Sequence, residues 1–353
     1  MKILVLGGGA QGKVIAADLA AALPQAAIDV ADIRRPSLPD RPNLRWREAD
    51  CSRPEVVAAL LAGYDFGVGA LPARFGLGAM QAAIAARRTL VDVSFCAEDP
   101  LALDADAKRA GVAIVPDAGL APGLSNLVIG RAVAERGAPE AITIYVGGVA
   151  QDPSVPYGYF VTWSLDDLLA EYTRPARIVR DGKPVTVPVF SDLERLRVEG
   201  AGELEAFNSD GLRTLIDTVP GVRDMAEKTL RWPGHAAAVQ PLVREGRFLE
   251  EFRARCVAEE PRDLVAFIVR SRWADGRRQE VTMVDRYDPA TRLTAMSRTT
   301  ALTTAVTAQL VASGGLERSG VLPLDFVAQD ERAYRFVLDG LAGRGVRLRT
   351  SQT

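Results

Sequence analysis

The stretch KILVLGGGAQGK, Lys2 to Lys13, joins a short apolar run to a turn with glycines at Gly7, Gly9 and Gly12. The run predicts a buried strand, and the glycine spacing is that of a dinucleotide-binding turn. In such a turn the first glycine permits the bend, the second admits a pyrophosphate, and the third lets the next helix pack closely. Unpaired N–H groups and the positive dipole at the start of that helix attract phosphate. The stretch therefore predicts a nucleotide-binding strand, turn and helix.

The sequence that follows supports this interpretation over a glycine-rich turn in an ordinary α/β protein. Val14 to Leu23 is rich in alanine and leucine and stops at Pro24, as a helix does. A second apolar run, Ala26 to Ala31, ends at Asp32, about twenty residues beyond the last glycine, where a carboxylate accepts hydrogen bonds from the adenosine ribose. The turn, helix, strand and acid therefore occur in the expected order.

The cofactor expected from this order is NAD, with NADP as the alternative. Asp32 would accept the ribose hydroxyls and repel a 2′-phosphate, whereas Arg34 and Arg35 could bind that phosphate if Asp32 turned away. The residues expected to contact the cofactor are Gly7, Gly9, Ala10, Gln11, Gly12, Asp32, Ile33, Asp50, Leu71 and Pro72.

Composition narrows the class of protein. The chain has 353 residues, 48% of them hydrophobic, which is enough for a core in each of two domains. A formal net charge of −2 with interspersed charges gives no basic surface for nucleic acid or membrane. The N-terminal apolar run is too short for a signal peptide, so we expect a cytoplasmic protein. Three widely spaced cysteines and a single histidine argue against a disulfide framework and a metal site.

The first third of the chain alternates strands and helices, which predicts a doubly wound parallel Rossmann sheet. From about residue 140 two hairpins are expected, turning at Asp181-Gly182 and Asp275-Gly276, and these indicate a second α+β domain with a mixed or antiparallel sheet. Short helices are expected at Ser164 to Glu171, Asp210 to Thr218 and Pro233 to Val243. We predict a Rossmann domain over 1–121, completed by C-terminal helices at about 296–353, and a substrate-binding and dimerisation domain over 122–295.

Several segments resemble the saccharopine dehydrogenase superfamily, and most closely its lysine 6-dehydrogenase type. They are VDVSFCAED (Val91 to Asp99), VPDAGLAPGLSN (Val115 to Asn126), GELEAFNSDGLRTL (Gly202 to Leu215), EKTLRWPGH (Glu227 to His235) and SRTT (Ser297 to Thr300). The resemblance implies a Rossmann domain, a mixed-sheet domain that also forms a homodimer, and NAD(P)-dependent chemistry on a side-chain nitrogen of an amino acid.

The chain departs from the saccharopine reductase pattern at two places. Phe95 follows Ser94 where those enzymes typically have Ser-Tyr, and Ala121 stands in place of an Asp. Both departures favour the lysine 6-dehydrogenase type. Against that type, Ala118 replaces a frequent Cys, and Ala301 and Thr303 replace a usual Gly and Pro.

Oxidative deamination needs a neutral amine, because the nitrogen lone pair must be free when hydride leaves the adjacent carbon. A lysine ε-ammonium has a pKa near 10.4, so the site is expected either to bind the rare neutral form or to provide a base. The catalytic candidates are Asp92, Asp117, Lys228 and His235. Three of these four have a structural alternative: Asp117 could cap a helix, Lys228 could be a solvated strand residue, and His235 could be packed in a core.

A substrate carboxylate favours the planar fork of an arginine. Arg231 is the preferred anchor, with Arg213 and Arg298 as competitors, and its structural alternative is packing between the domains. The substrate-binding candidates are Ser94, Phe95, Arg213, Thr229, Arg231 and Arg298.

Three functions remain open from the sequence. The first is oxidative deamination of the terminal amine of an amino acid, with L-lysine as the expected substrate. The second is reductive condensation of the saccharopine or carboxynorspermidine type, which needs two anchoring arginines. The third is a protein that binds NAD(H) as a redox sensor without turnover.

Overall fold

The computed structural model describes residues 1–353 and divides into two compact units. Unit 1 comprises Met1–Arg131 and Thr300–Gly345, and unit 2 comprises Ala132–Thr299 and Val346–Thr353. The chain thus returns to unit 1 at Thr300, and its last residues, Val346–Thr353, belong to unit 2.

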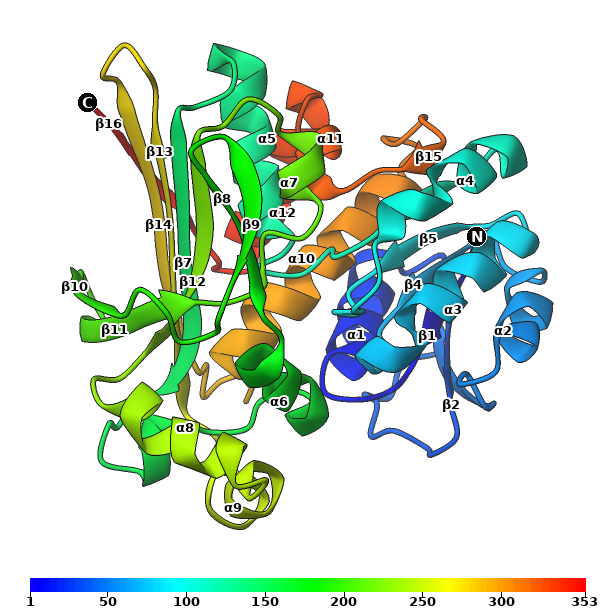
Figure 1. Cartoon of the computed structure of the whole chain (residues 1–353). Coiled ribbons are helices and arrows are strands. Elements are labelled where there is room, and N and C mark those ends of the chain that lie inside the picture. The colour runs from blue at the N-terminus through cyan, green and yellow to red at the C-terminus, as the bar shows by residue number, and fades with distance from the viewer. The chain divides into compact units, whose positions relative to one another are not determined.

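Unit 1 contains a seven-stranded parallel sheet in the order β15-β6-β5-β4-β1-β2-β3 (Figure 1). The strand order reverses between β1 and β4, and in open parallel sheets ligands bind beyond the carboxyl ends of the strands at such a reversal. The strands are β1 (Lys2–Leu6), β2 (Ala27–Asp32), β3 (Leu44–Glu48), β4 (Phe66–Gly69), β5 (Thr89–Asp92), β6 (Ala113–Val115) and β15 (Gly320–Val321). The doubly wound parallel sheet predicted from the sequence is confirmed.

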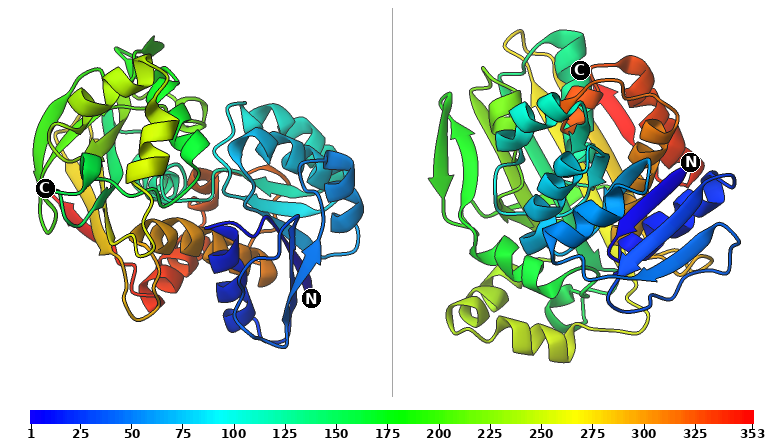
Figure 2. Two further views of the ribbon diagram at one scale, coloured as in Figure 1. Left: turned by 90° about the horizontal axis from the view of Figure 1, so that it is seen from below. Right: turned by 90° about the vertical axis from the view of Figure 1, so that its right-hand side faces the viewer.

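Helices cover both faces of this sheet (Figure 2). On one face α2, α3 and α4 pack on β1, β4, β5 and β6 around a shared apolar core that includes Leu4, Met80 and Leu90. The helices are α1 (Gly12–Ala22), α2 (Pro54–Leu61), α3 (Ala73–Ala85), η1 (Pro100–Leu103), α4 (Asp104–Ala110), α11 (Leu324–Val327) and α12 (Glu331–Gly343). Two further helices, α5 (Leu124–Arg136) and α10 (Ala295–Ala312), each continue from one unit into the other along the chain.

Unit 2 is built on a nine-stranded mixed sheet with the main order β10-β11-β12-β7-β13-β14-β16, to which β8 and β9 attach beside β12. Only β12 and β7 pair in parallel, and the other pairs are antiparallel. The strands are β7 (Ala141–Ala150), β8 (Ala176–Arg180), β9 (Lys183–Val187), β10 (Glu194–Val198), β11 (Gly202–Asn208), β12 (Asp224–Arg231), β13 (Asp263–Arg272), β14 (Arg278–Arg286) and β16 (Arg349–Gln352). The mixed sheet and both predicted hairpins are confirmed.

The helices of unit 2 include α6 (Leu165–Thr173), α8 (His235–Arg244) and α9 (Phe248–Arg255), which pack together around an aromatic cluster (Figure 1). Two shorter helical segments are η2 (Pro156–Gly158) and α7 (Leu215–Thr218). The prediction of a helix from Asp210 is wrong at its start. Arg213 has a φ of 52°, outside the helical region, and a Cβ on Gly211 would lie 1.5 Å from a carboxylate oxygen of Glu227.

Candidate active site

The glycine turn of unit 1 lies where the strand order reverses. Gly7 has a φ of 95°, and a Cβ there would lie 2.6 Å from the carbonyl oxygen of Ala70 after β4. A Cβ on Gly12 would lie 1.9 Å from the carbonyl oxygen of Gly7, so α1 packs directly on the turn. At Gly9 a Cβ would meet nothing within 4 Å. The backbone at Gly9 is therefore open to a ligand, while Gly7 and Gly12 shape the turn.

Asp32 ends β2 and holds the turn through its carboxylate. Its Oδ2 accepts a hydrogen bond from Gly8 N at 2.7 Å, and its Oδ1 accepts one from Arg34 N at 2.8 Å. Ile33 beside it is 61% exposed, so its side chain is accessible to an adenine ring. Arg35 lies over the ring of Trp46, 5.9 Å from its centroid.

Buried polar groups beside the turn fit a dinucleotide. Both amide atoms of the Gln11 side chain are buried without a hydrogen-bond partner in the chain. Such unmet groups are rare in folded proteins and indicate a missing partner. Leu71 and Pro72 follow β4, and Pro72 precedes α3. Asp50, after β3, accepts hydrogen bonds from Ser52 N and Oγ. An aspartate commonly forms a local turn in this way, and the role needs no ligand. Gly9, Gln11 and Asp32 would thus hold the cofactor.

Asp92 is a wholly buried carboxylic acid at the end of β5. Its Oδ1 accepts hydrogen bonds from the N and the hydroxyl of Ser94, and its Oδ2 has no partner. Burial raises the pKa of Asp92 to about 6, against the Ser94 hydrogen bonds that lower it, and the charge of Asp117 raises it further. Two glycines make room for this pair, because a Cβ on Gly69 would lie 1.8 Å from Asp92 Oδ2 and one on Gly76 would lie 2.0 Å from Ser94 Oγ.

Asp117 and Phe95 follow neighbouring strands of the same sheet. Asp117 is buried, and its φ of 53° is uncommon for a residue other than glycine. Strain of this kind gathers at functional positions. Phe95 is half-buried. Asp92, Ser94, Phe95 and Asp117 thus all lie at or just beyond the carboxyl ends of β5 and β6.

Arg231, at the end of β12 in unit 2, is buried, and acceptors within the chain occupy all three of its nitrogens. Nε donates to the Tyr172 hydroxyl at 2.7 Å, Nη1 to the carbonyl of Leu230 at 2.9 Å, and Nη2 to Glu171 Oε1 at 3.0 Å. The rings of Tyr159 and Tyr172 lie 5.0 and 5.4 Å from its Cζ. The structure therefore favours the structural interpretation of Arg231, inside unit 2, over a guanidinium open to substrate.

His235 begins α8 and continues the same network. Its Nδ1 lies 2.8 Å from the carbonyl of Tyr157, and its Nε2 lies 2.9 Å from the Tyr172 hydroxyl. Because a carbonyl only accepts, Nδ1 carries the proton, and Nε2 accepts from Tyr172. Burial and the charge of Arg231 lower the pKa of His235 to about 3. The imidazole is neutral and satisfied on both nitrogens, which favours its alternative as a packed core residue.

The motif EKTLRWPGH builds this network around a helix start. Gly234 has a φ of 93°, and its N and that of Ala236 donate to the two carboxylate oxygens of Glu205, at 2.8 and 2.6 Å. Glu205 therefore caps α8 from β11. The Thr229 hydroxyl donates its one proton to Glu171 Oε1 at 2.7 Å and accepts from the Ser209 hydroxyl at 2.9 Å. Glu171 and Tyr172 were missed in the sequence, where nothing marks them beyond their position in a short helical pattern.

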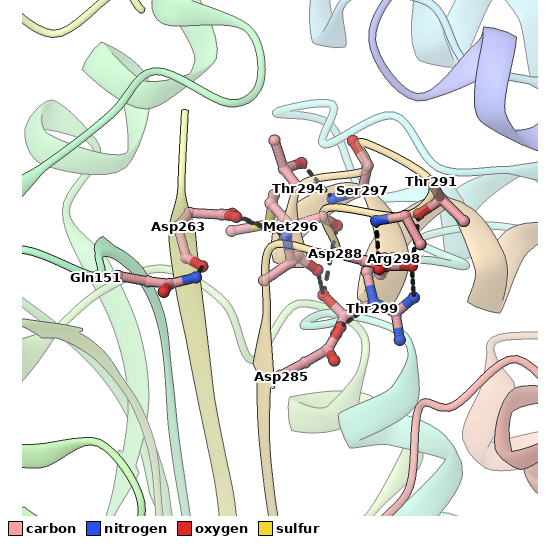
Figure 3. A network of polar contacts seen from close by, with 12 residues as sticks. Gln151, Asp263, Asp285, Asp288, Thr291, Thr294, Met296, Ser297, Arg298 and Thr299 are labelled. Carbon is pink, nitrogen blue, oxygen red and sulfur yellow. Dashed lines mark hydrogen bonds and ion pairs between the residues drawn. The ribbon is translucent and has the colours of Figure 1, made fainter. Parts of the chain in front are cut away.

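Two further candidates are held in ion pairs, and Figure 3 shows one of them. Arg298 on α10 donates from Nε to Asp285 Oδ2 at 2.8 Å, and its Nη1 lies 3.5 Å from Asp288. The same helix is capped by Asp263, which accepts from Met296 N at 2.9 Å (Figure 3). Lys228 donates to Glu194 Oε1 at 2.5 Å and to the Asp192 carbonyl at 2.9 Å, so its ammonium has an ion-pair partner.

Arg213 differs from Arg231 and Arg298 in its backbone. It is buried and lies at a φ of 52° in the segment that precedes α7.

No group of three or more His, Cys, Asp or Glu side chains is arranged to hold a metal ion. No helix is both long and apolar enough to cross a membrane.

The comparisons with known proteins match the chain to two family domains in succession. Residues 3–115 match the saccharopine dehydrogenase NADP-binding domain, and residues 119–346 match the saccharopine dehydrogenase C-terminal domain. The chain belongs to the saccharopine dehydrogenase family.

Curated members of this family match part of the chain. A saccharopine dehydrogenase [NADP(+), L-glutamate-forming] from Pyricularia oryzae is 26% identical over 39% of this chain, and the chain covers 32% of its length. The enzyme of that name from Saccharomyces cerevisiae is 25% identical over the same shares. The chain thus matches about a third of the length of these relatives.

Solved structures show the same fold along the whole chain. Apo saccharopine dehydrogenase (L-Glu forming) from Saccharomyces cerevisiae has a TM-score of 0.77 at 18% identity and covers 100% of this chain and 99% of its own. Homospermidine synthase from Legionella pneumophila in complex with NAD has a TM-score of 0.70 at 12% identity, covering 100% and 91%. At these identities the likeness extends to the fold alone.

Proposed function

We propose that this protein is an NAD(P)-dependent oxidoreductase that removes the terminal amine of an amino acid, with L-lysine as substrate and NAD as the favoured acceptor. The products are ammonia and 2-aminoadipate 6-semialdehyde, which cyclises to piperideine carboxylate. Homodimer formation and a cytoplasmic location stay predictions from the sequence.

The observation that carries this proposal is the buried carboxylate of Asp92 at the end of β5. Its Oδ2 has no hydrogen-bond partner in the chain, while Ser94 N donates to its Oδ1. An amine substrate supplies the hydrogen-bond donor that such an unmet carboxylate oxygen lacks. Of the three arginines considered as anchors for the substrate carboxylate, Arg231 is paired with Glu171 and Arg298 with Asp285 and Asp288. Arg213 stays the third candidate from the sequence.

The nitrogen chemistry assigns roles to the acids of unit 1. The cofactor, when bound on the glycine turn, accepts the hydride. Asp92, whose pKa is near 6, is mostly ionised at neutral pH and above, so it can accept a proton. Asp117 is the other proposed base. Lys228 is less suited, because its Nζ is already in an ion pair with Glu194.

The test measures reduction of NAD and of NADP by purified protein supplied with lysine, saccharopine, polyamine precursors or norleucine, which lacks the terminal amine. We expect reduction with lysine, none with norleucine, and a kcat/KM that rises with pH into the alkaline range because the reactive amine is the neutral form. The reverse reaction should require ammonia. Reduction with saccharopine but with no free terminal amine would overturn the proposal.

A reductase of the saccharopine type is the second candidate, and the curated relatives favour it. Both carry that name, although the chain matches only 32% of their length. The substrate comparison above separates the two functions. If NADH bound and no amine changed its absorbance, a non-catalytic redox sensor would replace both.

A further inference from the structure

A cavity of about 570 Å³ lies in unit 1 at the amino ends of β1 and β2, beside β3 and the last turn of α2. All of its lining residues belong to this one unit. The glycine turn follows the carboxyl ends of the same strands, so the length of the sheet separates it from the cavity. Sites for small molecules typically measure about 300–1,000 Å³. The cavity is therefore large enough for a ligand other than the cofactor.

Three cationic side chains line this cavity, but only one carboxylate does. The cations are Lys2, Arg45 and Arg47, and the carboxylate is that of Asp29. Asp29 Oδ2 accepts from the Tyr64 hydroxyl at 2.5 Å and lies 4.0 Å from Arg47 Nε. The Tyr64 hydroxyl accepts in turn from Arg47 Nη1 at 3.1 Å. Asp29 therefore balances Arg47, although Arg45 is its direct neighbour in the pairing of β2 with β3.

Lys2 and Arg45 remain without a partner in the chain. Both are exposed, and neither side chain makes a hydrogen bond or an ion pair. Cations can also stabilise the carboxyl ends of helices, which point to this end of the sheet. Here other groups bind those carbonyls: backbone N–H groups do so after α2, and Asn43 Nδ2 donates to the carbonyls of Ala20, Leu23 and Ala26 near the end of α1. The two cations are therefore free to bind an anion.

The charge and lining of the cavity indicate the kind of anion. A phosphate monoester carries about −1.5 to −2 charges at pH 7, so it balances both free cations, whereas a carboxylate balances one. The planar guanidinium of an arginine also donates two parallel hydrogen bonds to phosphate oxygens. Pro24, Pro42 and Leu60 add apolar surface to the same cavity. This surface suits an organic group attached to the phosphate.

We propose that the cavity binds a small phosphate monoester, with the phosphate held by Lys2 and Arg45 and the organic group packed on Pro24, Pro42 and Leu60. This site is separate from the glycine turn, and the inference does not depend on the proposed function.

The test titrates phenyl phosphate into the whole chain by calorimetry, at about 0.15 M salt to screen exposed charges. The protein carries no tag before Met1, because Lys2 lines the cavity. Phenyl phosphate should bind more tightly than inorganic phosphate, which lacks the organic group, and than benzoate, which has a single charge. Arg45→Gln and Lys2→Gln should each raise its Kd by roughly 10- to 100-fold, the range for hydrogen bonds to charged groups.

Arg41→Gln is the matched control. Arg41 is an exposed arginine directly before Pro42 and does not line the cavity. The substitution removes the same charge close by, so it should change the Kd of phenyl phosphate much less than Arg45→Gln does. Equal weakening by the two substitutions would show general attraction to a positive surface and would overturn the inference.

NADH distinguishes the cavity from the glycine turn, which could also attract a phosphate. Phenyl phosphate should bind equally well with and without saturating NADH. Binding that NADH displaces and that Arg45→Gln leaves unchanged would place the ligand on the glycine turn and contradict the proposal. The absence of binding at millimolar phenyl phosphate would also contradict it. If inorganic phosphate bound as tightly as phenyl phosphate, the assignment of an organic group to the apolar surface would be wrong.

Discussion

The glycine turn of unit 1 and the Arg231 network of unit 2 both gather polar groups in the interior, but they differ in how those groups are satisfied. Near the turn, the Gln11 amide and Asp92 Oδ2 are buried without partners. In the network, every nitrogen of Arg231 and both nitrogens of His235 have partners. The unmet groups indicate where a ligand binds, whereas the saturated ones indicate a rigid support, although EKTLRWPGH is the more distinctive motif of the two.

Among these predictions, substitution of Arg231 should lower the stability of the protein most. Arg231→Met leaves the Glu171 carboxylate and the Tyr172 hydroxyl without their buried partner, so we expect the free energy of unfolding to fall by about 3–5 kcal/mol. Urea denaturation followed by circular dichroism measures this. Arg231→Lys should also lose stability, because one ammonium cannot replace three donors. Full stability in Arg231→Lys together with a raised KM would restore the role of Arg231 as a carboxylate anchor.

Substitution at the turn should affect the ligand site. Gly12→Ala places a Cβ 1.9 Å from the Gly7 carbonyl oxygen, and the resulting overpacking should cost about 1–3 kcal/mol of stability and abolish measurable cofactor binding. Gly9→Ala is the matched control, because its Cβ meets no atom of the chain. It should keep the stability of the protein without cofactor and weaken only NAD binding, measured by titration. Equal stability losses in both variants would contradict the assigned glycine roles.

The buried acid of unit 1 and the buried histidine of unit 2 should give opposite pH dependences. The pKa of His235 falls from 6.5 to about 3 on folding, so its contribution to stability is present above pH 6.5 and is lost as the pH falls towards 3. The pKa of Asp92 rises from 3.8 to about 6, so its contribution is present below pH 3.8 and is lost as the pH rises through 6.

Two variants test these dependences through the free energy of unfolding between pH 4 and 7. His235→Gln should remove a slope of up to about 1.4 kcal/mol per pH unit, and Asp92→Asn should remove a slope of the opposite sign. Asp92→Asn should therefore be relatively more stable at pH 7 than at pH 4. A pH profile that neither substitution changes would show that the two groups keep ordinary pKa values.

The smallest expected effect concerns the choice of cofactor. Asp32→Ser removes a carboxylate that repels a 2′-phosphate and leaves Arg34 and Arg35 in place, so the ratio of kcat/KM for NAD over NADP should fall, by roughly tenfold. Since Asp32 also accepts from Gly8 N, some loss of NAD affinity is expected in addition. A clear preference for NADP in the unaltered protein would refute the assignment of NAD.

The sequence alone determined the elements whose signals are local. The strands from Lys2 to Val115 and the hairpins at Asp181-Gly182 and Asp275-Gly276 follow from apolar runs and turn residues within a few positions. The start of α8 at His235 follows from the turn residues Pro233 and Gly234 just before it. The roles of Gly7, Gly9 and Gly12 are equally local, because one turn contains all three.

Only the tertiary structure decided the partners of the functional candidates. Arg231 meets Glu171 and Tyr172 about sixty positions earlier in the chain. The parallel pairing of β12 with β7 and the antiparallel pairing of β16 with β14 at the C-terminus likewise join distant segments. A sequence motif identifies which side chains are present. Whether a guanidinium group is accessible to substrate depends on which hydrogen-bond acceptors the folded chain places next to it. Long-range packing therefore supplied the partners of Arg231 and revealed Glu171.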